Sequence, residues 1–153
     1  MQRIIASSLL GVFALGIAST ATADLTPEEQ IRFRQAGYSF MSWNMGRIKS
    51  NLDGNYNPEQ VAAAANAINA IATSGMGSLF GPGTDRNVGN VKTRVKPEFF
   101  DNLDDVAVIA GNFVAATNAL AAAANAGDEI EVSTTFGEVG QACKACHDKY
   151  RAD

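Results

Sequence analysis

The chain has 153 residues, of which 46% are hydrophobic, and it carries 12 Lys and Arg against 16 Asp and Glu. A net charge of −4 without a basic run argues against a surface built for nucleic acid or for an anionic membrane. The length allows one domain with a substantial hydrophobic core.

Residues 1–23 have the pattern of a secretory signal peptide. Arg3 supplies a positive charge, residues 4–18 are mostly apolar, and Ala21-Thr22-Ala23 matches an A-x-A cleavage site. The alternative, a membrane-spanning helix, is disfavoured because the run is short and polar residues follow at once. We expect export and a mature chain of residues 24–153, with eleven Lys and Arg against sixteen Asp and Glu. No later segment looks apolar enough to span a membrane, so no membrane insertion is expected.

The first predicted helix begins at a clear N-terminal signal. Thr26 can cap it, Pro27 suits the first helical position, and Glu29 completes a capping box. Residues on one face then recur at steps of three and four, and Arg34 is the only charged member. The turn residues of segment 51–58, NLDGNYNP, end the pattern. The face consists of Ile31, Arg34, Tyr38, Met41, Met45, Ile48 and Leu52.

The second predicted helix is short and leads into a long connection. Segment 57–60, NPEQ, repeats the capping arrangement, and Gly75 and Gly77 end the helix. The connection that follows, residues 76–96, is rich in Gly and Asn. It is longer than most helix connections, so we expect it to have a role of its own. The apolar face of the helix is Val61, Ala65, Ile68 and Ala72.

Two further helices complete the predicted fold. One starts at Pro97 and is closed by Gly127, and the other runs from about Glu129 to Arg151. A short extended piece at residues 133–136 is the alternative there, because β-branched residues gather in it, but the helical period outweighs it. Four amphipathic helices with two short links and one long one predict an all-α fold, an antiparallel four-helix bundle. The two faces are Phe99, Leu103, Val106, Ala110, Phe113, Thr117, Leu120 and Ala124, then Val132, Phe136, Val139, Cys143, Cys146 and Tyr150.

Both cysteines and the only histidine of the chain lie within residues 143–147, CKACH. C-x-x-C-H is the attachment signature of c-type haem. Residues three apart share one face of a helix, so Cys143 and Cys146 can both form thioethers with one porphyrin. His147 can then offer its imidazole to the iron from the same side. The sequence therefore predicts one covalently bound haem c, with His147 as the metal ligand.

Three other interpretations of the motif fit less well. A zinc site needs four donors and usually more Cys or His than this chain contains. A thioredoxin-like pair requires a βαβ setting, which the predicted helices do not provide. A plain disulfide would leave His147 unexplained and would sit awkwardly within a helix.

The second axial position of the iron must be supplied or shielded by another helix, because six residues follow the motif. With one histidine in the chain, a bis-histidine haem is excluded within one subunit. Small electron carriers often use His and Met. The first helix offers four candidate residues on its face: Arg34, Tyr38, Met41 and Met45.

The chain resembles cytochrome c′, the class II c-type cytochromes. RFRQAGYSFM at residues 32–41, LFGPGT at 79–84 and CKACHDKYR at 143–151 carry the resemblance, which extends over the mature chain. It implies a four-helix bundle with one haem between the helices and an iron with five ligands. It also implies binding of nitric oxide and carbon monoxide, and a homodimer packed through the first two helices.

The resemblance also implies roles for two residues of the first helix. Arg34 would bind a haem propionate through a charge-assisted hydrogen bond. Tyr38 would lie over the open face of the iron and shield it rather than bind it. The residues alone allow simpler interpretations. The aliphatic part of Arg34 could pack near an end of the bundle while its charged group reaches water, and Tyr38 could be an ordinary core residue.

Three more residues are candidates for contact with the haem. Met41 is the one residue that could make the iron six-coordinate, although a Met at such a position is more often core. Phe80 either fastens the connection to the bundle or, by resemblance, lies against the haem. Arg151 is either a frayed chain end or, by resemblance, the neighbour of the His147 imidazole. Phe33, Phe40 and Trp43 lie off the main face, where they either form a second apolar face for a partner subunit or pack loosely.

Three functions are compatible with these features. The protein could capture nitric oxide, carry electrons, or act as an enzyme such as a peroxidase. The enzyme lacks support, since no second histidine exists to serve as acid or base. We predict a non-enzymatic periplasmic haem protein with a five-coordinate, high-spin iron, which binds nitric oxide and carbon monoxide and can exchange one electron with an unidentified redox partner. A low-spin electron carrier with a His/Met haem is the alternative.

Overall fold

The computed structural model describes residues 24–153, so the predicted signal peptide, residues 1–23, lies outside the described residues. Within the described range the chain is helical, with isolated β-bridges and no strand. The elements are α1 (Pro27–Leu52), α2 (Pro58–Ala72), the 3₁₀ helix η1 (Met76–Leu79), α3 (Glu98–Asp101), α4 (Leu103–Ala126) and α5 (Glu129–Tyr150).

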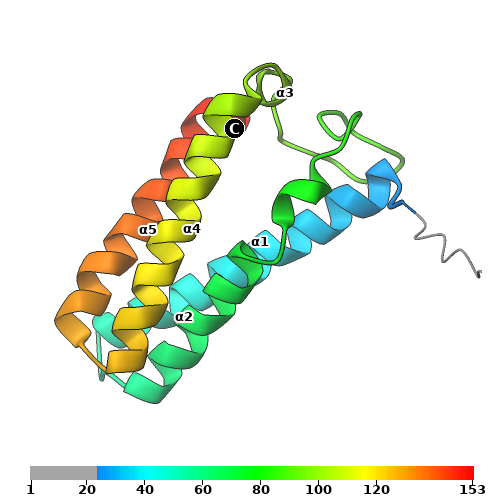
Figure 1. Cartoon of the computed structure of the whole chain (residues 1–153). Helices are drawn as coiled ribbons and strands as arrows, with labels where there is room; N and C mark the ends of the chain where they lie inside the picture. Colours follow the sequence, from blue (N-terminus) through cyan, green and yellow to red (C-terminus); the bar gives the residue numbers. More distant parts are fainter. Residues whose placement is uncertain (1–23) are drawn as a thin grey trace, which may run out of the picture.

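The four long helices form the predicted all-α, antiparallel four-helix bundle. Each of them packs along the next, α1 on α2, α2 on α4 and α4 on α5, as Figure 1 shows. Apolar side chains from all four helices meet in one core, which favours folding because it removes their surface from water. The buried core members are Met41, Ile48, Val61, Ala64, Ala65, Ile68, Leu120, Ala123, Ala124, Val132 and Val139.

Local capping explains where the helices begin and end. Thr26 and Glu29 form the predicted capping box, in which the Thr26 N–H donates to Glu29 Oε2 at 2.8 Å. The second predicted box is only half formed. Asn57 accepts from the Gln60 N–H at 3.0 Å, but its own N–H donates to Asn51 Oδ1 at 2.8 Å. Gly127 ends α4 in the left-handed conformation with a φ of 71°, as predicted.

The prediction of one unbroken helix from Pro97 to Gly127 is wrong at Asn102. This residue leaves the helical conformation, with φ −130° and ψ 43°, and separates α3 from α4. Its side-chain amide donates to the Glu98 carbonyl at 2.8 Å, so the side chain competes with the helical backbone. The break turns Phe99 inward while leaving Leu103, a predicted core residue, 57% exposed.

The expectation that no segment after residue 23 is apolar enough to span a membrane is wrong for α4. By length and composition alone, α4 meets that criterion within the described residues. A helix that lines a bundle core gives the same signal, and α4 contributes Leu120, Ala123 and Ala124 to the core.

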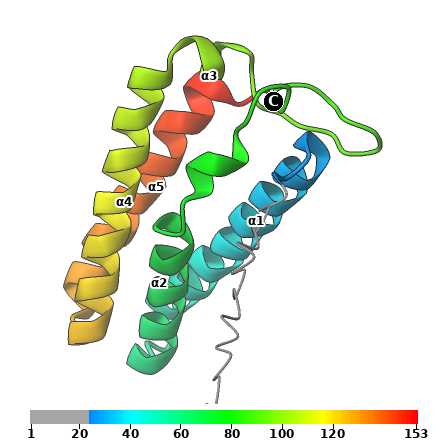
Figure 2. The ribbon, with the colours of Figure 1, turned by 45° about the vertical axis from the view of Figure 1, so that its right-hand side comes forward.

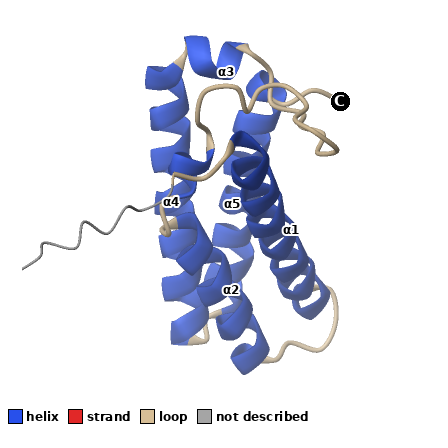
Figure 3. Cartoon of the chain, turned by 90° about the vertical axis from the view of Figure 1, so that its right-hand side faces the viewer, coloured by secondary structure: helices blue, strands red, loops and turns tan. Residues whose placement is uncertain are grey.

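The two helix pairs diverge toward the end of the bundle where the chain terminates. Figure 1 and Figure 2 show α1 and α2 leaning away from α4 and α5 at this end. The long connection lies across it, and α3 caps α4 and α5 (Figure 3). The connection pairs with the chain terminus, because the Lys96 N–H donates to the Tyr150 carbonyl at 2.9 Å and the Ala152 N–H to the Arg94 carbonyl at 2.8 Å.

Candidate functional site

The CKACH motif occupies the last two turns of α5, at the divergent end of the bundle. Cys143 and Cys146 are free thiols, and both are partly buried on the side of α5 that continues the core face. Burial raises the pKa of each thiol, so each is held as the neutral S–H. Two thiols three residues apart on one helix face match the attachment of one porphyrin.

His147 lies beside two arginines. Its Nδ1 is 3.2 Å from a terminal nitrogen of Arg151, which also caps α5 by donating its backbone N–H to the His147 carbonyl. Desolvation lowers the pKa of His147, and the positive charge of Arg94 lowers it further. Both effects favour the neutral imidazole, the form that binds a metal. Sequence reasoning found Arg151 but missed Arg94, because the pairing of the connection with the chain terminus creates this proximity.

Tyr38 is the α1 residue that faces the motif. The side chain keeps 43% of its area accessible, yet desolvation, with a contribution from Cys146, raises its pKa to about 12. The charges that act on Tyr38 include those of Cys146 and Cys143 on α5, and an exposure of 43% is not that of a core residue. The tyrosine therefore lies between α1 and α5 rather than in the packed core that the simpler interpretation placed it in.

Met41 takes a different position from Tyr38, although both belong to the same predicted face. It is 5% exposed and packs in the hydrophobic core with Ile48 and Val61. The structure thus places this candidate among core side chains, and a bond to iron would withdraw it from them. Removing a Met from such a core costs about 2–5 kcal/mol.

Phe80 follows η1 and joins an aromatic row. Its ring is edge-on to Tyr38, with centroids 6.5 Å apart, and stacks on Phe99 at 4.7 Å. Phe99 in turn meets Tyr150 edge-on at 5.8 Å. The sequence predicted Phe99 on the apolar face of one long helix. In the structure it lies in α3, which Asn102 separates from α4, and it joins this aromatic row.

Arg34 is buried, with 2% of its surface exposed, and it contacts the long connection. Its two terminal nitrogens donate four hydrogen bonds to acceptors on Leu79, Thr84 and Thr93. The guanidinium also lies 4.6 Å from the centroid of Phe80. The simpler sequence interpretation, a charge reaching water, is therefore wrong.

A polar network that sequence reasoning missed holds the last turn of α5 to α4. The Tyr150 hydroxyl donates to Asp105 Oδ2 at 2.6 Å, and Lys149 donates to both carboxylate oxygens at 3.0 Å. The hydrogen bond from Tyr150 lowers the pKa of Asp105 and raises that of Tyr150 to about 12. Because these residues lie two and three positions after His147, the network fixes the turn that carries the imidazole.

These residues fit a c-type haem. The two free thiols and the imidazole come from α5, and Tyr38 and Phe80 supply an aromatic wall from the other side. Among residues 24–153, no group of three or more His, Cys, Asp or Glu side chains is placed to hold a metal ion.

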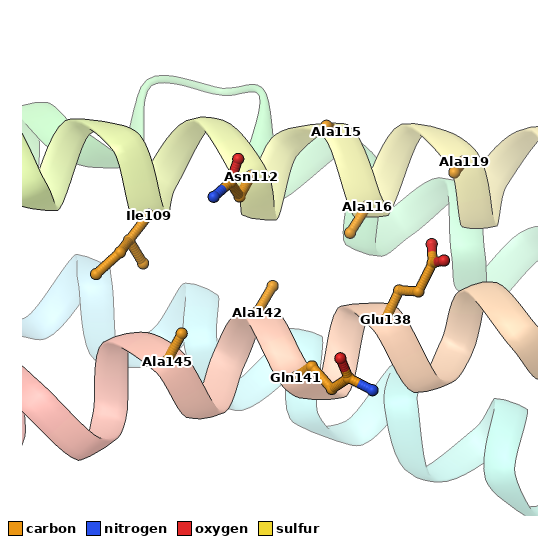
Figure 4. Close-up of a pocket in the computed structure, with 9 residues that line it drawn as sticks. All are labelled: Ile109, Asn112, Ala115, Ala116, Ala119, Glu138, Gln141, Ala142 and Ala145. Atoms are coloured by element: carbon orange, nitrogen blue, oxygen red, sulfur yellow. The ribbon is translucent and has the colours of Figure 1, made fainter.

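A shallow groove of about 430 Å³ runs along the seam between α4 and α5. Figure 4 shows Ile109, Ala142 and Ala145 beside it, with small side chains along much of its length. Ala142 and Ala145 each precede a motif cysteine by one residue, so they point about 100° away around the helix. The groove is thus a separate feature from the site at the motif.

Comparison with known proteins gives a consistent result. The profile of the family described as Cytochrome C′ matches residues 29–151. A cytochrome c′ of Allochromatium vinosum is 63% identical, and the match covers 99% of each chain. The crystal structure of cytochrome c′ from Thermochromatium tepidum is 65% identical, covers 86% of this chain and all of its own, and superposes with a TM-score of 0.84.

Other solved structures describe ligands and assembly of related proteins. A cytochrome c′ with ligand-controlled dimer dissociation is 66% identical, with a TM-score of 0.84 over 86% of this chain and all of its own. Variants of cytochrome c′ from Alcaligenes xylosoxidans, 28% and 29% identical, were solved with nitric oxide and with carbon monoxide bound. Each has a TM-score of 0.73 over 84% of this chain, and the matches cover 97% and 98% of their own chains.

Proposed function

Because the chain belongs to the cytochrome c′ family, we propose that it is an exported haem protein whose high-spin, five-coordinate iron binds nitric oxide and carbon monoxide. The chain carries one c-type haem, as this family does, and is a haem protein rather than an enzyme. When bound, the haem supplies an iron with an open coordination position and a one-electron redox couple. The gas-bound structures of relatives support the choice of ligands.

The observation that carries this proposal is the different placement of Tyr38 and Met41. Tyr38 lies near Cys146, whereas Met41 is packed in the core. Phenolic oxygen is a poor ligand for ferrous iron, so this wall shields the position opposite His147. In the proposed site Cys143 and Cys146 would form thioethers with the porphyrin, and His147 would bind the iron. Arg151 lies beside this imidazole, with a terminal nitrogen 3.2 Å from Nδ1.

The alternative is a low-spin electron carrier with a His/Met iron. It would require Met41 to leave the core and reach past Tyr38, and we therefore rank it second. One-electron transfer to an unidentified redox partner is compatible with either coordination.

An optical spectrum of the oxidised and reduced protein, with and without carbon monoxide, tests the proposal. We expect a reduced spectrum of the high-spin type and a shift when carbon monoxide is added. A reduced spectrum that is already low-spin, with split visible bands, would instead support the His/Met carrier.

Export to the periplasm and the mature range 24–153 are parts of the same proposal. The solved relatives support them, because two of these match over their whole length while covering 86% of this chain. The uncovered share corresponds to the length of the predicted signal peptide. The N-terminal residue of protein purified from the periplasm would test the cleavage after Ala23.

A homodimer is the proposed assembly, and α1 is the proposed interface. Phe33, Phe40 and Trp43 are each more than half exposed on the outer side of this helix. Phe40 stacks on Trp43 with centroids 5.4 Å apart, and Arg47 lies 5.0 Å from the Trp43 ring. Grouped aromatic side chains with an arginine are typical of the centres of protein interfaces.

Replacing Phe40 and Trp43 together by Glu should shift the protein from dimer to monomer in sedimentation velocity runs at micromolar concentration. The substitution removes the two stacked rings and places carboxylates that would have to lose their water at the interface, which opposes association. Val108→Glu is the matched control, since Val108 is 62% exposed but lies on α4. A wild-type protein that sediments only as a monomer would refute the dimer, and an equal effect of the control would refute the interface.

A further inference from the structure

We infer that Arg34 is a positioning residue: it anchors the segment 79–93, here called the strap, and thereby fixes the aromatic side chain that borders Tyr38. The inference rests on the proposed function, because its consequence is control of ligand entry at Tyr38. It differs from the role that family resemblance implies for Arg34, which is a direct bond to a haem propionate.

The strap contributes every acceptor of the four hydrogen bonds from Arg34. One terminal nitrogen donates to the Leu79 carbonyl at 3.2 Å and to Thr84 Oγ1 at 2.8 Å. The other donates to the Thr84 carbonyl and to Thr93 Oγ1 at 2.7 Å. These acceptors are up to 14 positions apart in the sequence, so one side chain of α1 holds both ends of the strap.

The burial of Arg34 makes these bonds costly to lose. The side chain lies on the apolar face of α1 with 2% exposure, and desolvation lowers the pKa of its guanidinium. All four partners are neutral oxygens, so the buried charge depends on these hydrogen bonds, and the Phe80 ring and the negative charge of Asp85 stabilise it further. The four bonds use the N–H groups of both terminal nitrogens, which leaves Nε–H as the donor available for any other acceptor.

Two other side chains of α1 hold the strap less firmly. Gln30 accepts from the Gly81 N–H at 2.8 Å, and Gln35 donates to the Lys92 carbonyl at 2.6 Å. Each of these contacts is a single bond, and Gln35 is exposed to solvent, where water competes. Arg34 is therefore the buried anchor of the strap.

Phe80 links this anchor to the site. It belongs to the strap, stacks under the Arg34 guanidinium at 4.6 Å, and meets the edge of Tyr38. Phe99 packs on its ring at 4.7 Å and couples it to the end of α5. If the strap moves, Phe80 moves with it, and Tyr38 gains space to swing aside.

The test separates anchoring of the strap from a direct contact of Arg34 with the haem. One variant, Arg34→Met, removes the guanidinium. A second, the double substitution Thr84→Val and Thr93→Val, keeps Arg34 and its charge but removes two strap acceptors. Arg32→Met and Thr134→Val are matched controls, because Arg32 pairs only with Glu28 on the exposed side and Thr134 lies at the other end of α5.

Two measurements are made on each holoprotein. The first is the rate of carbon monoxide association with the ferrous form after flash photolysis. The second is the rate of tryptic cleavage after Arg86 and Lys92, which lie in the strap and are exposed. We expect Arg34→Met and the double Thr variant to raise both rates by about tenfold, which corresponds to about 1.4 kcal/mol in each barrier or opening equilibrium. The controls should match the wild type.

Three results would overturn the inference. If Arg34→Met changes association while the double Thr variant matches the wild type in both assays, Arg34 acts on the haem directly. If cleavage accelerates without a change in association, the strap does not control Tyr38. If neither variant changes either rate, Arg34 does not anchor the strap. A wild type that binds no carbon monoxide would contradict the proposed function as well as the control of entry, and the tryptic assay alone would then decide whether Arg34 anchors the strap. Should Arg34→Met fail to fold, the double Thr variant alone still tests the inference, because wild-type rates in both assays would overturn it.

Discussion

Replacing Tyr38 by Ala should raise the rate of carbon monoxide association with the ferrous protein by about tenfold to a hundredfold. The tyrosine lies on the side of α1 that faces α5, in edge contact with Phe80 and near Cys146. In the proposed site, a ligand that approaches the iron from the side of α1 would have to displace this ring. Removing a steric barrier of about 1.4–2.8 kcal/mol gives an acceleration of this size.

Two other substitutions of Tyr38 distinguish the effect of the size of its side chain from the effect of its chemical group. Tyr38→Phe keeps the ring and loses only the hydroxyl, so its association rate should stay near that of the wild type. Tyr38→Met places a thioether at the shielding position and should produce a low-spin spectrum with His and Met as ligands. If the Ala variant binds carbon monoxide as slowly as the wild type, Tyr38 does not limit ligand entry.

Replacing both Cys143 and Cys146 by Ala should abolish covalent attachment of the haem. The two thiols are the only cysteines of the chain, and both lie on the same side of α5. Without them no sulfur remains to form a thioether. The wild-type protein should keep haem-linked peroxidase staining on denaturing gels, and its mass should exceed that of residues 24–153 by one haem.

The double variant should lose staining and release its haem into acid–acetone. Lys144→Ala is the control, because Lys144 lies between the cysteines, is exposed and pairs with Asp148. It should retain the haem as the wild type does. Retention of haem by the double Cys variant through acid–acetone extraction would contradict thioether attachment.

Features that depend on neighbouring residues were predictable from the sequence. Thr26, Pro27 and Glu29 determine the start of α1 through contacts within one helical turn, and Gly127 ends α4 because it adopts a positive φ. The spacing of Cys143, Cys146 and His147 is equally local, so the sequence alone identifies the haem motif. The periodicity of apolar residues also predicted four helices and the core residues Ile48, Val61, Leu120 and Val139.

The sequence predicted helix ends less well where an asparagine side chain has alternative hydrogen-bond partners. The Asn102 side chain bonds to the Glu98 carbonyl and breaks the predicted third helix, and the Asn57 N–H donates to Asn51 Oδ1 instead of the Gln60 side chain. In both cases an asparagine side chain makes a local hydrogen bond to the backbone that competes with the predicted one.

The tertiary structure alone decided which side chains meet at the site. The helical period of 3.6 residues predicts that Arg34, Tyr38 and Met41 share one side of α1. It does not predict which residues of other elements lie opposite each of them. The divergence of the helix pairs leaves Tyr38 facing α5, whereas Met41, one turn further, lies where α1 and α2 pack closely. Arg34 meets Thr84 and Thr93, and His147 meets Arg94, only because the connection folds back over this end of the bundle. Such contacts join residues about 50 positions apart, and the free energy that selects them comes from packing and burial rather than from any local sequence signal.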